Sequence, residues 1–205
     1  MDISPQILTG HWKAGFALDL HTVSSVPQKD AEGNNILDVN GKIKWDTTYT
    51  SIGLEMNHLK YWKERHRAEI IGNVAAEWLQ KQLATWKINV IIPIPPSDTT
   101  REFQPVYEIV KHISSGCKLP VDLNIVKKIK ATTPQKGIID IEQRREELKD
   151  AFAIINNCLW GKNVLLFDDL YRSGETLNAV CDILINQGKA ASVYVLTITK
   201  TRRNR

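Results

Sequence analysis

Two adjacent carboxylates, Asp168 and Asp169, end an apolar run, and a polar turn with Ser173, Gly174 and Thr176 follows them. Backbone N–H groups of a glycine-containing turn that opens a helix can cradle an anion, aided by the helix dipole and by hydroxyls. Carboxylates at a strand tip accept hydrogen bonds from paired hydroxyls, as on a ribose, or help to hold a hydrated cation. Together these groups suit a phosphorylated ribose. The alternative is an ordinary strand-to-helix turn with a capping residue.

This constellation needs a strand that ends at the acids and a helix that starts after the turn. Residues 164–167 are wholly apolar, as in a buried strand, and residues 176–187 have helical spacing. Other strands are predicted at 88–94, 121–129 and 192–199, and other helices at 103–114 and 143–149. Apolar strands separated by helices are typical of a mainly parallel sheet covered on both faces. We therefore expect an α/β fold whose ligands bind at the carboxyl ends of the strands.

The N-terminal part has a different pattern and predicts a β-rich cap, or hood. Residues 14–23 alternate partly, as in a half-buried strand, and Asn40-Gly41 favours a hairpin with a type I′ turn. From residue 53 the apolar period becomes helical, which predicts two helices that meet near residues 63–66. We therefore expect a cap over residues 1–52 and a core over residues 53–205, ending in a basic tail.

Composition excludes several classes of protein. Of the 205 residues, 42% are hydrophobic and 24% charged, which excludes a disordered chain, and a net charge of +4 does not by itself argue for nucleic acid. Three scattered cysteines argue against a disulfide framework, and neither they nor the five histidines have the spacing of metal ligands. No signal peptide and no run of about 18 apolar residues is found, so we expect a soluble, cytoplasmic protein.

Residues 164–177 resemble the phosphoribosyl pyrophosphate (PRPP) signature of type I phosphoribosyltransferases, with an apolar strand, two acids and a Thr-Thr-Gly-x-Thr-like loop. They depart from it at Tyr171 and Arg172, where small or hydroxylated residues are commoner. Further segments resemble the ComF-like branch, whose members are linked to competence and DNA uptake: Leu59-Lys60-Tyr61, residues 91–97 and 101–106, Thr133-Pro-Gln135, Arg144 and Ala151-Phe152. The N-terminal zinc-binding cysteines of many ComF-like proteins are absent.

The resemblance implies a pentosyl-transferring glycosyltransferase that uses PRPP with Mg²⁺ and displaces pyrophosphate with a nucleophile, usually a nitrogen. The ribose hydroxyls would be held by Asp168 and Asp169, with Arg144 as a further catalytic candidate because it matches a motif position.

The resemblance also implies the loops around the substrate. The 5′-phosphate loop would consist of Arg172, Ser173, Gly174, Glu175 and Thr176. The pyrophosphate loop would consist of Ile94, Pro95, Pro96, Ser97 and Arg101, with the N–H groups of Ile94 and Ser97 as donors. A lid would contain Lys130, Gln135 and Lys136. No side chain is expected to bind the metal directly, because Mg²⁺ would be held mainly by PRPP and water.

Two classes of function stay open. One is a working phosphoribosyltransferase with an unidentified acceptor in nucleotide metabolism. The other is a catalytically silent PRPP-fold sensor or binding module, associated with nucleic acid or a helicase in DNA-uptake or repair machinery. The acids, the phosphate loop and the basic lid favour PRPP binding in both cases, and fold analogy alone does not separate them. A homodimer would fit either class, and no membrane partner is expected.

Overall fold

The computed structural model describes residues 1–96, 98, 100–130, 142, 147–148, 150–155 and 159–202. Four candidate site residues, Ser97, Gln135, Lys136 and Arg144, lie outside the described residues, as does most of the helix expected at 143–149. Within the described part, no helix is long and apolar enough to cross a membrane.

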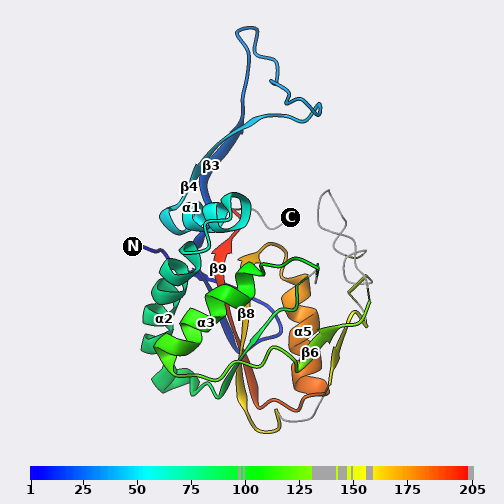
Figure 1. The fold of residues 1–205 in the computed structure, drawn as a ribbon. Helices are drawn as coiled ribbons and strands as arrows, with labels where there is room; N and C mark the ends of the chain where they lie inside the picture. The colour runs from blue at the N-terminus through cyan, green and yellow to red at the C-terminus, as the bar shows by residue number, and fades with distance from the viewer. Residues whose placement is uncertain are drawn as a thin grey trace.

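A five-stranded sheet forms the centre of the molecule (Figure 1). Its strands lie in the order β1 (Gln6–Ile7), β2 (Ala14–Leu20), β9 (Ser192–Lys200), β8 (Asn163–Tyr171) and β5 (Val90–Pro93). All neighbouring pairs are parallel except β1–β2. The mainly parallel sheet predicted from the apolar runs is confirmed. Two strands of the segment expected to be a cap, β1 and β2, nevertheless belong to this sheet, and the division at residue 52 stays a proposal.

Helices cover both faces of the sheet, which explains the uninterrupted apolar run in β8. Leu165 and Phe167 pack with the helices α2 (Arg67–Trp86) and α3 (Pro105–Cys117), whereas Val164 and Leu166 pack with α5 (Glu175–Asn186). All four side chains are fully buried. Because neighbouring side chains of a strand point to opposite faces, such a strand must be apolar throughout.

The predicted break near residues 63–66 separates two helical segments. The first comprises α1 (Ser51–Asn57) and a π-helical turn, η1 (His58–Trp62), and the second is α2. Thr50 caps α1, because its hydroxyl accepts a hydrogen bond from the Gly53 N–H at 3.1 Å. Lys63 ends η1 in the left-handed region, with φ of +58°. Residues 58–62 therefore present their side chains from a π turn, a geometry often found at functional sites.

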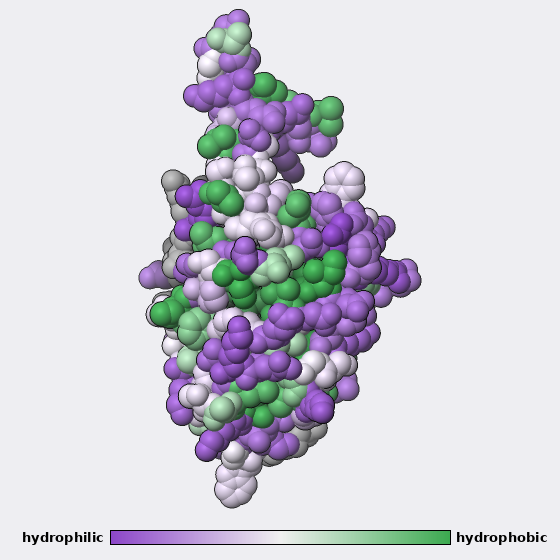
Figure 2. Space-filling model, turned by 90° about the vertical axis from the view of Figure 1, so that its left-hand side faces the viewer, coloured by the Kyte–Doolittle hydropathy of each residue, from purple (hydrophilic) through white to green (hydrophobic). Residues whose placement is uncertain are grey.

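An arm rises from the body of the molecule (Figure 1) and carries apolar side chains among polar ones (Figure 2). It consists of β3 (Thr22–Pro27), β4 (Trp45–Tyr49) and the chain between them. The type I′ turn expected at its end is wrong, because Gly41 has a φ of +73° but Asn40 has no positive φ. The carboxylate of Asp38 instead accepts hydrogen bonds from the N–H groups of Asn40 and Lys42, at 2.8 and 2.9 Å. This side-chain turn competes with the type I′ geometry.

The strand expected over residues 121–129 is shorter and lies outside the main sheet. Only β6 (Val126–Lys128) is extended, and it pairs antiparallel with β7 (Phe152–Ile154). Asp122 causes the change, because its carboxylate accepts hydrogen bonds from the N–H groups of Asn124 and Ile125, at 2.9 and 3.1 Å. The resulting turn takes the chain away from the sheet edge after a single bridge between Val121 and Ile91.

Candidate functional site

A cleft of roughly 840 Å³ opens where β5 and β8 end, beside η1 and the first turn of α5. Of the described candidates, it is lined by Ile94, Pro95, Pro96, Arg101, Asp168, Asp169, Arg172, Ser173, Gly174, Glu175 and Thr176. Lys130 does not line it, and its N–H lies instead 3.4 Å from the carbonyl oxygen of Ala151, next to β7. The structure therefore brings three of the predicted groups together: the acid pair, the phosphate turn and the loop after β5.

The acid pair lies within β8, which continues to Tyr171 instead of ending at Phe167. The N–H of Asp169 donates a hydrogen bond of 2.8 Å to Oδ1 of Asp168. Burial, followed by the charge of Asp169, raises the pKa of Asp168 to about 7, although this N–H and the ammonium of Lys60 oppose the rise. Near neutral pH the carboxyl of Asp168 is therefore divided between its protonated and ionised forms.

Lys60, from η1, forms an ion pair with one member of the acid pair. Its Nζ lies 2.6 Å from Oδ2 of Asp169, and only 25% of the lysine side chain and 16% of the aspartate side chain are exposed. Sequence reasoning placed Lys60 in the Leu59-Lys60-Tyr61 element but gave it no role. The contact joins residues far apart in the chain, so no local pattern could have revealed it. The similarity of the Leu59-Lys60-Tyr61 element to the ComF-like branch was the single sequence signal that pointed to Lys60.

His21 is the second residue near the acids that sequence reasoning missed. It follows β2, and its Nδ1 lies 3.1 Å from Oγ1 of Thr199. Burial, aided by the charge of Lys60, lowers the pKa of His21 to about 4, and the charge of Asp169 opposes this effect. The imidazole is therefore uncharged at neutral pH. No spacing in the sequence links this histidine to the acid pair.

The phosphate turn is built around Gly174, which has a φ of +85° and caps α5. A Cβ at this position would lie 2.7 Å from Oη of Tyr171, so glycine is required by both conformation and space. Tyr171, which departs from the family pattern, is buried and meets Trp12 edge to face, with ring centroids 6.4 Å apart. The Tyr171 side chain thus packs between Gly174 and Trp12 and supports the turn from the protein interior. Arg172 is exposed and lines the cleft.

The loop after β5 differs from expectation in its donors. The N–H of Ile94 donates a hydrogen bond of 2.8 Å to the carbonyl oxygen of Phe167, so Ile94 is not a free backbone donor as predicted. The parallel register of β5 with β8 ends at Pro93 opposite Phe167, and the Ile94 N–H makes the last hydrogen bond between the two strands. Arg101 lines the cleft with its Nε 3.2 Å from Oδ2 of Asp98, and both side chains are largely exposed.

Cations and carboxylates both line the cleft. Two of its arginines, Arg65 and Arg101, pair with the carboxylates of Glu102 and Asp98. Across the described ranges, no three His, Cys, Asp or Glu side chains form a group that could hold a metal ion. The acid pair contributes only two carboxylates, and one of them is bonded to an ammonium. This arrangement suits a hydroxylated, anionic ligand.

The chain is similar to one curated competence protein. It is 27% identical over 161 residues to the competence protein ComFC of Bacillus subtilis (strain 168). The match covers 76% of this chain and 63% of ComFC, so the chain spans less than two thirds of that relative's length. No family model matches the sequence.

Several solved structures are also similar. They include a hypoxanthine phosphoribosyltransferase from Staphylococcus aureus (18% identity, 69% of this chain and 67% of that chain, TM-score 0.43). A hypoxanthine phosphoribosyltransferase from Trypanosoma cruzi matches at 11% identity over 69% and 68% of the two chains, with a TM-score of 0.47. The glutamine PRPP amidotransferase of B. subtilis matches at 14% identity over 79% and 35%, with a TM-score of 0.46.

Proposed function

Because this chain is a ComF-like protein with the type I phosphoribosyltransferase fold, we propose that it binds PRPP in the cleft and transfers the phosphoribosyl group to a nitrogen nucleophile. One observation carries the proposal: the acid pair of β8 and the glycine turn that opens α5 line the same cleft. The proposed diol receptor and the proposed phosphate receptor thus line one cleft, as a single sugar phosphate would require.

The proposed reaction is a displacement at the anomeric carbon. The nucleophile forms a bond to this carbon while the bond to the pyrophosphate oxygen breaks, and pyrophosphate leaves with the electron pair. Asp168 and Asp169 would hold the ribose hydroxyls and stabilise the positive charge that develops on the ring. The turn of residues 172–176 would bind the 5′-phosphate, and Arg101 would contact the leaving group.

Mg²⁺ is proposed to enter with PRPP, which would supply most of its ligands together with water. Two adjacent carboxylates, one of them already bonded to Lys60, suit such an outer role better than direct coordination. The site roles of Ser97, Gln135, Lys136, Lys130 and Arg144 remain proposals that rest on the family resemblance. A cytoplasmic location and a homodimer are likewise proposals.

An acceptor screen tests the enzymatic proposal. The full chain is incubated with PRPP, Mg²⁺ and each of a panel of nucleobases and other nitrogen nucleophiles, and released pyrophosphate is measured. We expect release with at least one acceptor, and a loss of at least a hundredfold in the Asp169→Asn variant. Release that is unchanged in this variant would contradict the assignment of the acid.

A second candidate function, a PRPP-binding module without turnover, is favoured by the similarity to a competence protein. It predicts PRPP binding without pyrophosphate release, and DNA binding that weakens steeply with salt. Deleting residues 202–205, which follow β9, should then abolish DNA binding. If no DNA binding is found at low salt, the module is excluded.

A further inference from the structure

We propose that Lys60 is a positioning residue for the ribose site, where its ammonium holds the Asp169 carboxylate in place as a hydroxyl acceptor. A polar network centred on Glu64 would in turn fix the π-helical turn that carries Lys60. This inference rests on the proposed function, because it assigns the support of the same site.

The contact itself is short and enclosed. Nζ of Lys60 and Oδ2 of Asp169 are 2.6 Å apart, and three quarters or more of each side chain is shielded from solvent. A charge-assisted hydrogen bond in such a setting is stronger than an exposed ion pair and fixes the orientation of the carboxylate. Lys60 also supplies only one of its three N–H donors to this bond.

The acid pair needs a cation close by. Two neighbouring carboxylates in a half-buried site repel each other, and the charge of Asp169 adds to burial, the larger cause, in raising the pKa of Asp168. His21, from the end of β2, lies close enough to Asp169 for that charge to oppose the fall of its pKa, and Arg172, from the turn after β8, acts on His21 in turn. His21 is uncharged at neutral pH, and Arg172 is exposed. Lys60 is therefore the cation positioned to fix Asp169.

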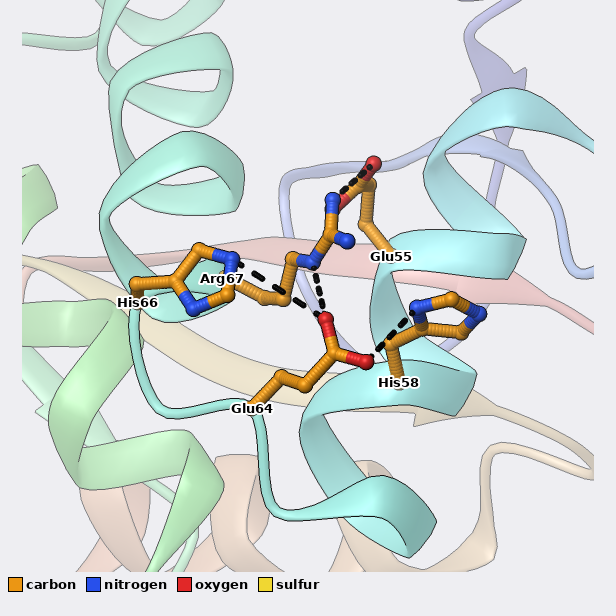
Figure 3. A network of polar contacts seen from close by, with 5 residues as sticks. All are labelled: Glu55, His58, Glu64, His66 and Arg67. Atoms are coloured by element: carbon orange, nitrogen blue, oxygen red, sulfur yellow. Dashed lines mark hydrogen bonds and ion pairs between the residues drawn. The ribbon is translucent and has the colours of Figure 1, made fainter.

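The turn that carries Lys60 is held by a network of five side chains (Figure 3). Glu64 is its centre, with one carboxylate oxygen 2.8 Å from Nε of Arg67 and the other 3.3 Å from Nδ1 of His58. His66 Nε2 lies 3.9 Å from Glu64, at the edge of the network. Nη1 of Arg67 also lies 3.0 Å from Glu55. The network thereby joins η1 to α1, to the connecting loop and to α2.

Two features indicate that this network helps to hold η1 in place and is not merely a set of exposed ion pairs. The side chains of Glu55, His58, Glu64 and Arg67 are between 15% and 30% exposed, so their contacts are partly shielded from solvent. Leu59, which neighbours Lys60, is fully buried in the core beside α2. The direction of Lys60 is therefore set by contacts on both sides of the turn.

Calorimetric titration with PRPP tests the role of Lys60 in the full chain. We expect Lys60→Met to weaken PRPP binding about tenfold or more, and Lys60→Arg to restore most of the affinity. Lys81→Met is the control, because Lys81 is exposed on α2 and does not line the cleft. Its expected effect is twofold or less, as for a general loss of positive charge.

A double-mutant cycle separates positioning from attraction at a distance. In the Asp169→Asn background, Lys60→Met should cause no further loss, because its partner is already gone. Additive losses would overturn the proposal, as would a Lys60→Met variant that binds PRPP as well as or better than wild type. If Lys60→Met fails to fold, Lys60→Gln replaces it with the same expectations.

The network is tested by Glu64→Gln and Arg67→Met. Each should weaken PRPP binding about three- to fivefold, whereas Lys111→Met, which breaks an ion pair with Glu108 on α3, should have no effect. Equal affinities in all three variants would overturn the part played by the network. Absence of PRPP binding in wild type would refute the proposed function and this inference together, whereas wild-type binding with an indifferent Lys60 would refute the inference alone.

Discussion

Asp168 and Asp169 are neighbours in the chain but differ in their surroundings. Asp169 is bonded to Lys60, whereas Asp168 accepts a hydrogen bond from the Asp169 N–H and has a pKa raised to about 7 by burial and by its charged neighbour. The two carboxyls therefore differ in their chemistry: Asp169 is held by the Lys60 ammonium, and Asp168 changes its protonation near neutral pH.

The raised pKa of Asp168 predicts a pH dependence of stability. Between its ordinary value of 3.8 and about 7, the folded protein binds this proton more tightly than the unfolded chain does, so the contribution of Asp168 to stability falls as the pH rises through that window. Asp168→Asn removes the buried charge. The variant should be more stable than wild type at pH 8 by about 1–3 kcal/mol and nearly equal to it at pH 4, measured by urea unfolding. The same difference at both pH values would contradict the assignment.

At the scale of elements, the turn between β8 and α5 depends on Gly174. Its φ of +85° and the approach of Tyr171 exclude a side chain. Gly174→Ala should lower the free energy of unfolding by about 2 kcal/mol and also weaken PRPP binding. Gly161→Ala is the matched control, because Gly161 has a φ of +72° but no neighbour within 4 Å of an added Cβ. It should cost about 1 kcal/mol and leave binding unchanged. Equal costs at the two glycines would show that the approach of Tyr171 has no effect.

How far the sequence predicts these elements depends on whether the deciding contacts are local. The strand and helix on either side of the acids were predictable, because both depend on the period of their own residues. The membership of β2 in the main sheet was not predictable, because half-buried alternation looks the same in a separate cap and in that sheet. The pairing of Ala14 with Tyr194, which decides it, joins residues distant in sequence. The role of Lys60 was hidden for the same reason. The turn at Asp122 had a local signal, an Asp-x-Asn pattern, which the apolar residues around it outweighed.

At the scale of the whole molecule, the arm stands apart from the cleft. Its base is tied down by Tyr49, whose Oη accepts a hydrogen bond of 2.9 Å from Asn57, and by Thr50, whose hydroxyl donates to the Leu20 carbonyl oxygen at 2.6 Å. Residues 28–44 lie beyond this base, and none of them lines the cleft. An acceptor nucleobase bound in the cleft is therefore not expected to contact residues 28–44.

Shortening the arm tests this separation. A variant with residues 28–44 replaced by Asn-Gly keeps β3, β4 and the base. We expect its unfolding midpoint to stay within about 2 °C of wild type, because no core contact is removed, and its PRPP affinity to be unchanged. A loss of PRPP affinity in a folded variant would indicate that the arm acts on the cleft.

The most direct test of the proposed PRPP site is calorimetric titration of PRPP with Mg²⁺ into wild type and into the Asp168→Asn, Asp169→Asn double variant. We predict binding by wild type, and loss of binding by a double variant that still unfolds cooperatively. Equal binding by both proteins, or no binding by wild type even in the presence of nucleobases, would contradict a PRPP site in this cleft.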